Sequence, residues 1–273
     1  MPDPPREEAQ AGAGPLLFHY TDQAALIGIV QRQELWASRA RFLNDTSELM
    51  HAYELTAGEC RRRLEAGLDP ASTAWLQGFV VYVEEVGHPD PAQYIVSLSE
   101  NGDLLSQWRG YGDYAVGLLA ENLNQISSWR LVKCIYDREV QRDLSAAAVE
   151  RALWELRAGH WNSIGADERD RGFHAVGDQL RQLAPMLKHE AFSEEAEWRL
   201  VSEMLNPFPT PKIRAGARSL IAYTAVRIEP GTVREVVVGP GPHREVRTAG
   251  VTSLLEGLGT DWSVRQSRAP YLP

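Results

Sequence analysis

The chain has 273 residues, of which 44% are hydrophobic and 24% are charged, and its formal charge is −9. This is the composition of an ordinary globular protein, and the negative charge argues against a protein that coats nucleic acid. The two cysteines, Cys60 and Cys134, form no CxxC pair, so the sequence carries no zinc signature and fits a reducing cytoplasm.

In chain order, residues 1–14 are polar and rich in Pro, Ala and Gly, which predicts a disordered tail and not a secretory signal. "LLFHY" from Leu16 predicts a strand, and apolar residues at helical spacing predict a helix within 22–34.

No apolar run approaches the roughly 20 residues of a membrane helix, so we expect no membrane partner. Further strands are predicted at 35–38, 93–100, 115–119, 129–137, 197–204, 219–228, 233–239 and 262–267.

Helices are predicted from about 45 to 65, where Asp45 and Glu48 match a capping box, and at 72–85 and 243–258. The segment 138–190 is predicted to be a mainly helical insertion. This mixture of helices and clustered strands predicts an α+β fold with a single domain over 15–273.

Two groups of candidate residues lie before residue 100. His19, Tyr20 and Thr21 mark the junction between the first strand and helix, where free backbone N–H groups can hold a ligand. The alternative is that Thr21 caps the helix and His19 is a half-buried strand residue. Ser97 and Ser99, two apart on a strand, share one face, which alone indicates a solvated face.

Trp108 and Tyr111 are three residues apart, so one helical turn places both rings on one side. Most such pairs belong to a core, and a minority stack on a flat ring. In "SEEAEWRLV", strand alternation would put Glu195, Glu197 and Arg199 on one face. That face is either a salt-bridged surface or a pair of carboxylates that divide a catalytic task.

Several other chemistries lack their motifs. The chain contains no HExxH, no GxSxG and no phosphate-binding P-loop. We therefore expect no bound metal.

The order and spacing of several segments resemble the bacterial domain-of-unknown-function family 2971. The resemblance covers nearly the whole chain from Leu16 on and implies no function. It rests on "FHYTDQAALIGIVQRQELWAS", "FLNDTSEL", "YIVSLSE", "LSQWRGYGDYAVGL", "EAEWRLV", "VREVVVGPG" and "RQSRAPYL".

A second resemblance concerns the ADP-ribosyltransferase-like fold, which implies split antiparallel sheets and NAD as substrate. "LFHYT" followed by a helix resembles the start of its DNA-modifying toxin branch, and "SLS" and "EAE" resemble motifs of arginine-directed members. By this resemblance Glu197 stabilises the ribosyl cation and Glu195 prepares the acceptor. The remaining residues would bind NAD: His19, Tyr20, Thr21, Ser97, Ser99, Trp108, Tyr111 and Arg199, or Arg109 in place of Arg199.

The resulting hypothesis is a cytoplasmic enzyme that transfers ADP-ribose from NAD to an unidentified protein, nucleic-acid or small-molecule acceptor and releases nicotinamide. Its setting would be a toxin or a phage-defence system. The first alternative is a non-catalytic module that senses a nucleotide or binds a protein. The second is a metal-dependent nucleic-acid hydrolase, for which the sequence offers no recognisable ligand spacing.

Overall fold

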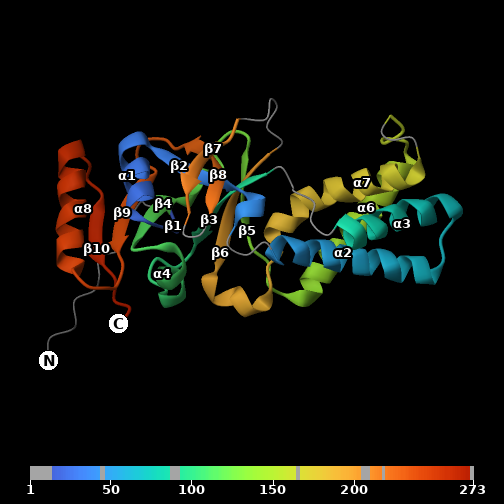
Figure 1. Ribbon diagram of the computed structural model, residues 1–273, viewed down its shortest axis with the longest axis horizontal. Helices are drawn as coiled ribbons and strands as arrows, with labels where there is room; N and C mark the ends of the chain where they lie inside the picture. The colour runs from blue at the N-terminus through green and yellow to red at the C-terminus, as the bar shows by residue number, and fades with distance from the viewer. Residues whose placement is uncertain are drawn as a thin grey trace. The chain divides into compact units, whose positions relative to one another are not determined.

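The computed structural model describes residues 14–43, 47–86, 93–163, 167–203, 210–216 and 219–270 (Figure 1). Residues 1–13 of the predicted tail and Asp45 of the predicted capping box lie outside this part. The chain groups into two compact units, each drawn from separate stretches of sequence. Unit 1 comprises 1–35, 99–127 and 227–273, and unit 2 comprises 36–98 and 128–226. Both contain helices and strands, which confirms the predicted α+β class.

Unit 1 is built on a mixed sheet in the order β10-β9-β4-β1. β9 and β4 are antiparallel, as are β4 and β1, whereas β10 runs parallel to β9. The sheet therefore differs from the split antiparallel sheets that the ADP-ribosyltransferase resemblance implies, because it contains a parallel pair. The strands are β1 (Leu16–Thr21), β4 (Tyr114–Leu119), β9 (Val233–Val238) and β10 (Ser263–Gln266). The helices are α1 (Gln23–Arg32), α4 (Leu105–Tyr111), α5 (Ala120–Asn124) and α8 (Arg244–Leu258).

The strands of unit 2 pair mainly with antiparallel neighbours. β5 pairs with β6, β2 with β3 and β7 with β8, all antiparallel, and β6 also pairs with β3. The hairpin strand β7 is short and largely exposed, so it lacks the alternation that would have predicted it. The strands are β2 (Glu34–Arg39), β3 (Tyr94–Ser99), β5 (Trp129–Lys133), β6 (Glu197–Ser202), β7 (Lys212–Ala215) and β8 (Leu220–Arg227).

Four long helices pack together in unit 2: α2 (Ser47–Ala66), α3 (Pro70–Val86), α6 (Arg138–Arg157) and α7 (Glu168–Leu183) (Figure 1). The predicted helical segment supplies α6 and α7, whose apolar faces are covered by α2 and α3 from earlier in the chain. Asp137 caps α6 by accepting the N–H groups of Glu139 and Val140. The described part of this unit also contains three short 3-10 helices: η1 (Ala40–Phe42), η2 (Ala184–Met186) and η3 (Glu190–Glu195).

Glycines allow α3 and α7 to approach closely. A Cβ on Gly172 would lie 2.1 Å from the Trp75 carbonyl oxygen, and one on Gly78 would lie 2.5 Å from that of Arg169. Both positions therefore require a residue without a side chain. Among the described helices, none combines the length and the apolar character needed to cross a bilayer.

Candidate functional site

The first predicted group lies on β1 in unit 1. His19, Tyr20 and Thr21 pair in register with residues of β4. Thr21 still belongs to the strand, and the N-cap of α1 is Asp22, whose Oδ1 accepts the Ala25 N–H at 2.9 Å. The interpretation that Thr21 caps the helix is therefore wrong by one residue. His19 is half-buried, as its strand position predicted.

Tyr20 is held in the interior of unit 1. Its hydroxyl donates to the Asn101 carbonyl at 2.8 Å and accepts the Leu104 N–H at 2.9 Å. Burial raises the pKa of this phenol to about 12. The ring contacts Trp108 edge to face, with centroids 4.6 Å apart. These contacts commit Tyr20 to the packing of unit 1.

Trp108 lies on α4 and is also largely buried, at 8% exposure. Its indole N–H donates to Asp103 Oδ1 at 2.9 Å, and the same carboxylate accepts from Ser267 Oγ and from the Arg268 N–H. Burial opposes ionisation of Asp103, but these hydrogen bonds outweigh it and keep its pKa below the ordinary value. Trp108 is therefore a core residue, whereas Tyr111 remains 40% exposed.

The two predicted serines fall in different units, because the division passes between residues 98 and 99. Ser99 belongs to unit 1 and is buried, and its Oγ accepts the Asn101 N–H at 3.0 Å. Ser97 belongs to unit 2 and is half-buried. The expectation of a solvated face is therefore wrong for Ser99.

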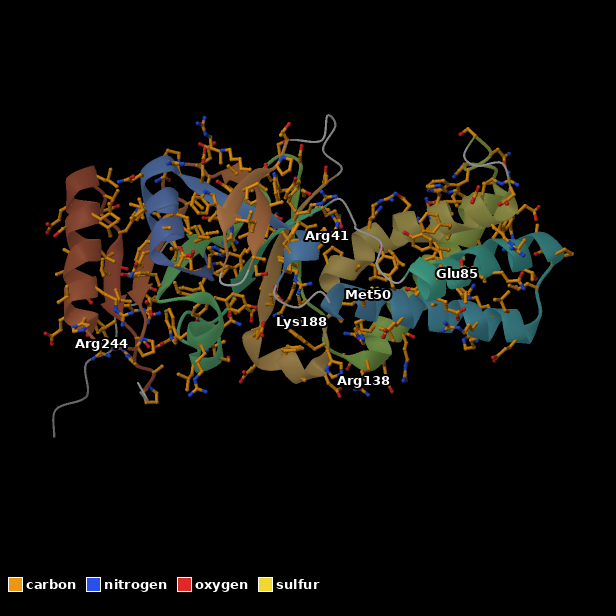
Figure 2. The ribbon with its side chains drawn as sticks, viewed as in Figure 1. Arg41, Met50, Glu85, Arg138, Lys188 and Arg244 are labelled. Atoms are coloured by element: carbon orange, nitrogen blue, oxygen red, sulfur yellow. The ribbon has the colours of Figure 1, made fainter. Side chains whose placement is uncertain are left out.

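The predicted acidic residues meet in unit 2 around a lysine that the sequence analysis did not single out. Figure 2 labels this residue, Lys188. Its Nζ lies 2.6 Å from Glu195 Oε2 and 2.6 Å from Glu197 Oε2. Arg199 donates from Nε to Glu197 Oε1 and from Nη2 to Oε2, each at 2.9 Å. We call Lys188, Glu195, Glu197 and Arg199 the Lys188 network. It joins two cations and two carboxylates.

The Lys188 network is buried. Lys188, Glu197 and Arg199 are 2%, 4% and 1% exposed. Burial alone would raise the pKa of Glu197, but the charges of Arg199 and Lys188 and their hydrogen bonds lower it to about 2. Glu197 is thus ionised, and each of its carboxylate oxygens accepts from a cation. The alternative of a salt-bridged surface face is wrong, because this polar face points inward.

A change of backbone conformation, and not a continuous strand, brings the two glutamates together. Glu195 ends η3, Ala196 adopts a left-handed conformation with φ 42°, and β6 begins at Glu197. The prediction that Glu195 shares a strand face with Glu197 and Arg199 is therefore wrong for Glu195. On β6 itself, Glu197 and Arg199 do share a face, as alternation requires.

Backbone contacts fix Glu197 at the start of β6. Its N–H donates to the Tyr136 hydroxyl oxygen at 2.9 Å, and its carbonyl accepts the Cys134 N–H at 2.9 Å. The Cys134 thiol lies 3.8 Å from Glu197 Oε2. The carboxylate is therefore enclosed by protein groups.

Gln141 connects this region to the surface of α2. Its Nε2 donates to the carbonyls of Ile135 at 2.6 Å and Lys188 at 2.8 Å, so its Oε1 must be the atom that meets His51 Nε2 at 2.8 Å. His51 Nε2 therefore carries a proton and donates. In the neutral ring this leaves Nδ1 as an acceptor.

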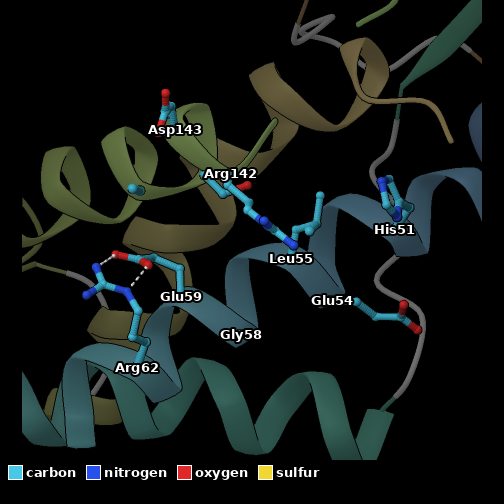
Figure 3. A pocket seen from close by; sticks show the side chains of 10 residues that line it. His51, Glu54, Leu55, Gly58, Glu59, Arg62, Arg142 and Asp143 are labelled. Atoms are coloured by element: carbon cyan, nitrogen blue, oxygen red, sulfur yellow. Dashed lines mark hydrogen bonds and ion pairs between the residues drawn. The ribbon is translucent and has the colours of Figure 1, made fainter. Parts of the chain in front are cut away.

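A pocket of about 540 Å³ opens beside this contact, between α2 and α6 (Figure 3). Its volume is within the range of small-molecule sites. Across the described residues, no hydrogen bond or ion pair reaches the guanidinium of Arg142. Ser145 Oγ is buried and has no hydrogen-bond partner. The pocket is lined by His51, Glu54, Leu55, Gly58, Glu59, Arg62, Arg142, Asp143, Ser145 and Ala146.

Sequence reasoning missed both Lys188 and the pocket residues for a physical reason. Lys188 follows η2, where no helical or strand periodicity connects it to Glu195 or Glu197. The residues that line the pocket come from two helices about ninety residues apart in sequence. No spacing within either segment could therefore predict the pocket. Within the described stretches, no group of three or more His, Cys, Asp or Glu side chains is placed to hold a metal ion.

The fold and these sites describe an α+β protein with a group of four packed helices, a buried charge network and a pocket between two of those helices. A family model described as "Protein of unknown function (DUF2971)" matches residues 107–200, which supports the resemblance to that family over this segment. The matched segment includes α6, α7 and all four residues of the Lys188 network. No curated protein matches the chain. No solved structure matches it either.

Proposed function

We propose that this protein is a non-catalytic binding module and that the pocket between α2 and α6 holds its ligand. The observation that carries the proposal is the contrast between two sets of charged groups. In the Lys188 network, the carboxylate of Glu197 is enclosed and balanced by cations. In the pocket, Arg142 and Ser145 have polar atoms without a hydrogen-bond partner in the described part of the chain.

A carboxylate that stabilises a ribosyl cation must reach the reacting carbon in the transition state. Glu197 is 4% exposed, and contact with a substrate would require it to give up hydrogen bonds to Lys188 or Arg199. Breaking a buried ion pair costs several kcal/mol. We therefore assign the Lys188 network to holding η3 against β6.

A pocket-filling substitution tests the binding function. A Cβ on Gly58 meets nothing within 4 Å, so the side chain of Gly58→Leu starts in open space and reduces the volume of the pocket. Gly177 on α7 has equally open surroundings and lies outside the pocket, which makes Gly177→Leu the matched control. Ligands found by ligand-observed NMR should bind the wild type and Gly177→Leu but not Gly58→Leu. Equal binding to all three proteins overturns the assignment.

The second candidate is an NAD-dependent ADP-ribosyltransferase-like enzyme, with the fold that its motifs implied. One observation favours it: Glu195 and Glu197 converge on one ammonium group, and the side chain of Glu195 is 15% exposed. Glu195 is then the carboxylate nearer to solvent. Nicotinamide release from NAD separates the candidates. A binding module gives no release above buffer, whereas the enzyme gives release that Glu197→Gln slows by about 10²-fold or more.

A further inference from the structure

We propose that the ligand of the pocket between α2 and α6 is a small organic acid, whose single carboxylate binds Arg142 and whose apolar body lies against α2. This inference rests on the proposed binding function and names the class of ligand.

Arg142 is the anchor of this site. It lies on α6, and Figure 3 shows its side chain directed toward α2, from which Leu55 also lines the pocket. The other arginine of the pocket, Arg62, forms two hydrogen bonds of 2.7 Å with the carboxylate of Glu59. Arg62 is thus neutralised, whereas Arg142 has no acidic partner among the described residues. A guanidinium presents parallel N–H groups that fit the two oxygens of a carboxylate.

Ser145 provides a second, independent indication of a ligand. It lies three residues after Arg142 on the same helix, which places both on one face of α6. Ser145 is 1% exposed, and none of the described residues forms a hydrogen bond with its Oγ. A buried hydroxyl without a partner is unfavourable by itself. A carboxylate held by Arg142 would give this hydroxyl an acceptor.

The acidic side chains of the pocket select a singly charged ligand. Glu54 and Asp143 also line it, and neither has a cationic partner in the described part of the chain. Figure 3 shows both directed away from Arg142. Both carboxylates repel a negatively charged ligand in the pocket, and this repulsion grows with the negative charge of the ligand. A carboxylate is therefore favoured over a phosphate ester or a nucleotide.

The apolar residues of the pocket favour a ligand with an aliphatic chain. Leu55, Gly58 and Ala146 supply carbon surface next to Arg142, and the volume of about 540 Å³ suits a compact molecule. Among the described lining residues His51 is the only one with an aromatic ring, so they provide little surface for stacking a base. An aliphatic acid fits this combination of groups.

Four six-carbon probes with the full-length protein test the ligand class: hexanoate, hexyl phosphate, hexylamine and hexanol. Binding is measured by NMR titration of the wild type, Arg142→Gln and Arg151→Gln. Arg151 is an exposed arginine of α6 outside the pocket and serves as the control. Hexanoate should bind most tightly, and Arg142→Gln should weaken it roughly 10-fold or more. Arg151→Gln should change its affinity less than 2-fold.

Ser145→Ala separates a ligand contact from a structural role. Because the hydroxyl has no partner, its removal should leave the melting temperature unchanged or raise it. The same change should weaken hexanoate roughly threefold or more.

Each failure has its own signature. If the other probes match hexanoate, or if Arg142→Gln leaves its affinity intact, while Gly58→Leu still abolishes binding, the ligand class is refuted and the binding function stands. If no probe binds in a manner sensitive to Gly58→Leu, both proposals fall.

Discussion

Replacing Glu197 by glutamine removes one charge from the centre of the Lys188 network while preserving the shape of the side chain. The substitution removes the carboxylate that both Lys188 and the buried Arg199 contact in the wild type. Removing one partner of a buried ion pair typically costs about 3–5 kcal/mol. A pKa of about 2 against the ordinary 4.5 corresponds to roughly 3 kcal/mol of favourable interaction with the charged form. The two routes agree in magnitude.

This loss is a large share of the free energy of unfolding of a typical domain, about 5–15 kcal/mol. Urea denaturation followed by tryptophan fluorescence measures it. Glu190→Gln is the control, because the Glu190–Arg138 pair is more than half exposed and should contribute about 1 kcal/mol or less. A loss below about 1 kcal/mol for Glu197→Gln at pH 7 would refute the structural assignment.

The pH dependence has a definite sign. The folded-state pKa of Glu197 lies below its ordinary value, so its contribution is complete above about pH 4.5 and is lost as the pH falls toward 2. The difference in unfolding free energy between wild type and Glu197→Gln should therefore narrow by roughly 1 kcal/mol or more from pH 7 to pH 3. A constant difference contradicts the assignment of the charge to Glu197.

Two further substitutions test the packing of each unit. Gly172→Ala should destabilise the protein by about 1–3 kcal/mol, because its methyl group would meet the Trp75 carbonyl. Gly177→Ala on the same helix is the control and should be neutral or stabilising. Thermal denaturation compares the two variants, and equal melting temperatures would contradict the close contact between the helices. Asp103→Asn should lower the free energy of unfolding by about 1–3 kcal/mol, because the carboxylate accepts hydrogen bonds from Trp108, Ser267 and Arg268. It should also increase amide exchange at residues 267–269, which these hydrogen bonds hold in place. Unchanged exchange there would contradict this role.

Local patterns predicted the elements of this fold better than its contacts. The buried runs of β4 and β9 and the helical spacing of α1 follow from hydrophobic periodicity, which each segment carries by itself. The parallel pairing of β10 with β9 and the grouping into two units depend on connections between distant segments. No period within one segment encodes them.

The candidate sites show the same difference. Alternation placed Glu197 and Arg199 on one face, but it does not reveal whether that face is wet or buried. The buried Lys188 pairs with Glu197 and so allows this face to lie in the interior. Lys188 follows the 3-10 helix η2, in a segment that has no helical or strand periodicity. Trp108 belongs to the core, which was the more common of the two alternatives for an aromatic pair. Its buried indole N–H is satisfied by Asp103. Ligand roles for His19 and Tyr111 stay predictions.

The interleaving of α2 and α3 with α6 and α7 has a practical consequence for recombinant work. A polypeptide cut to residues 107–200 would retain α6 and α7 but lose the two helices that cover them. Side chains such as Val149, Leu153, Val176 and Leu180, all at most 1% exposed in the intact chain, would then face water. Such a fragment would aggregate on expression, so the shortest useful piece must begin before Ser47.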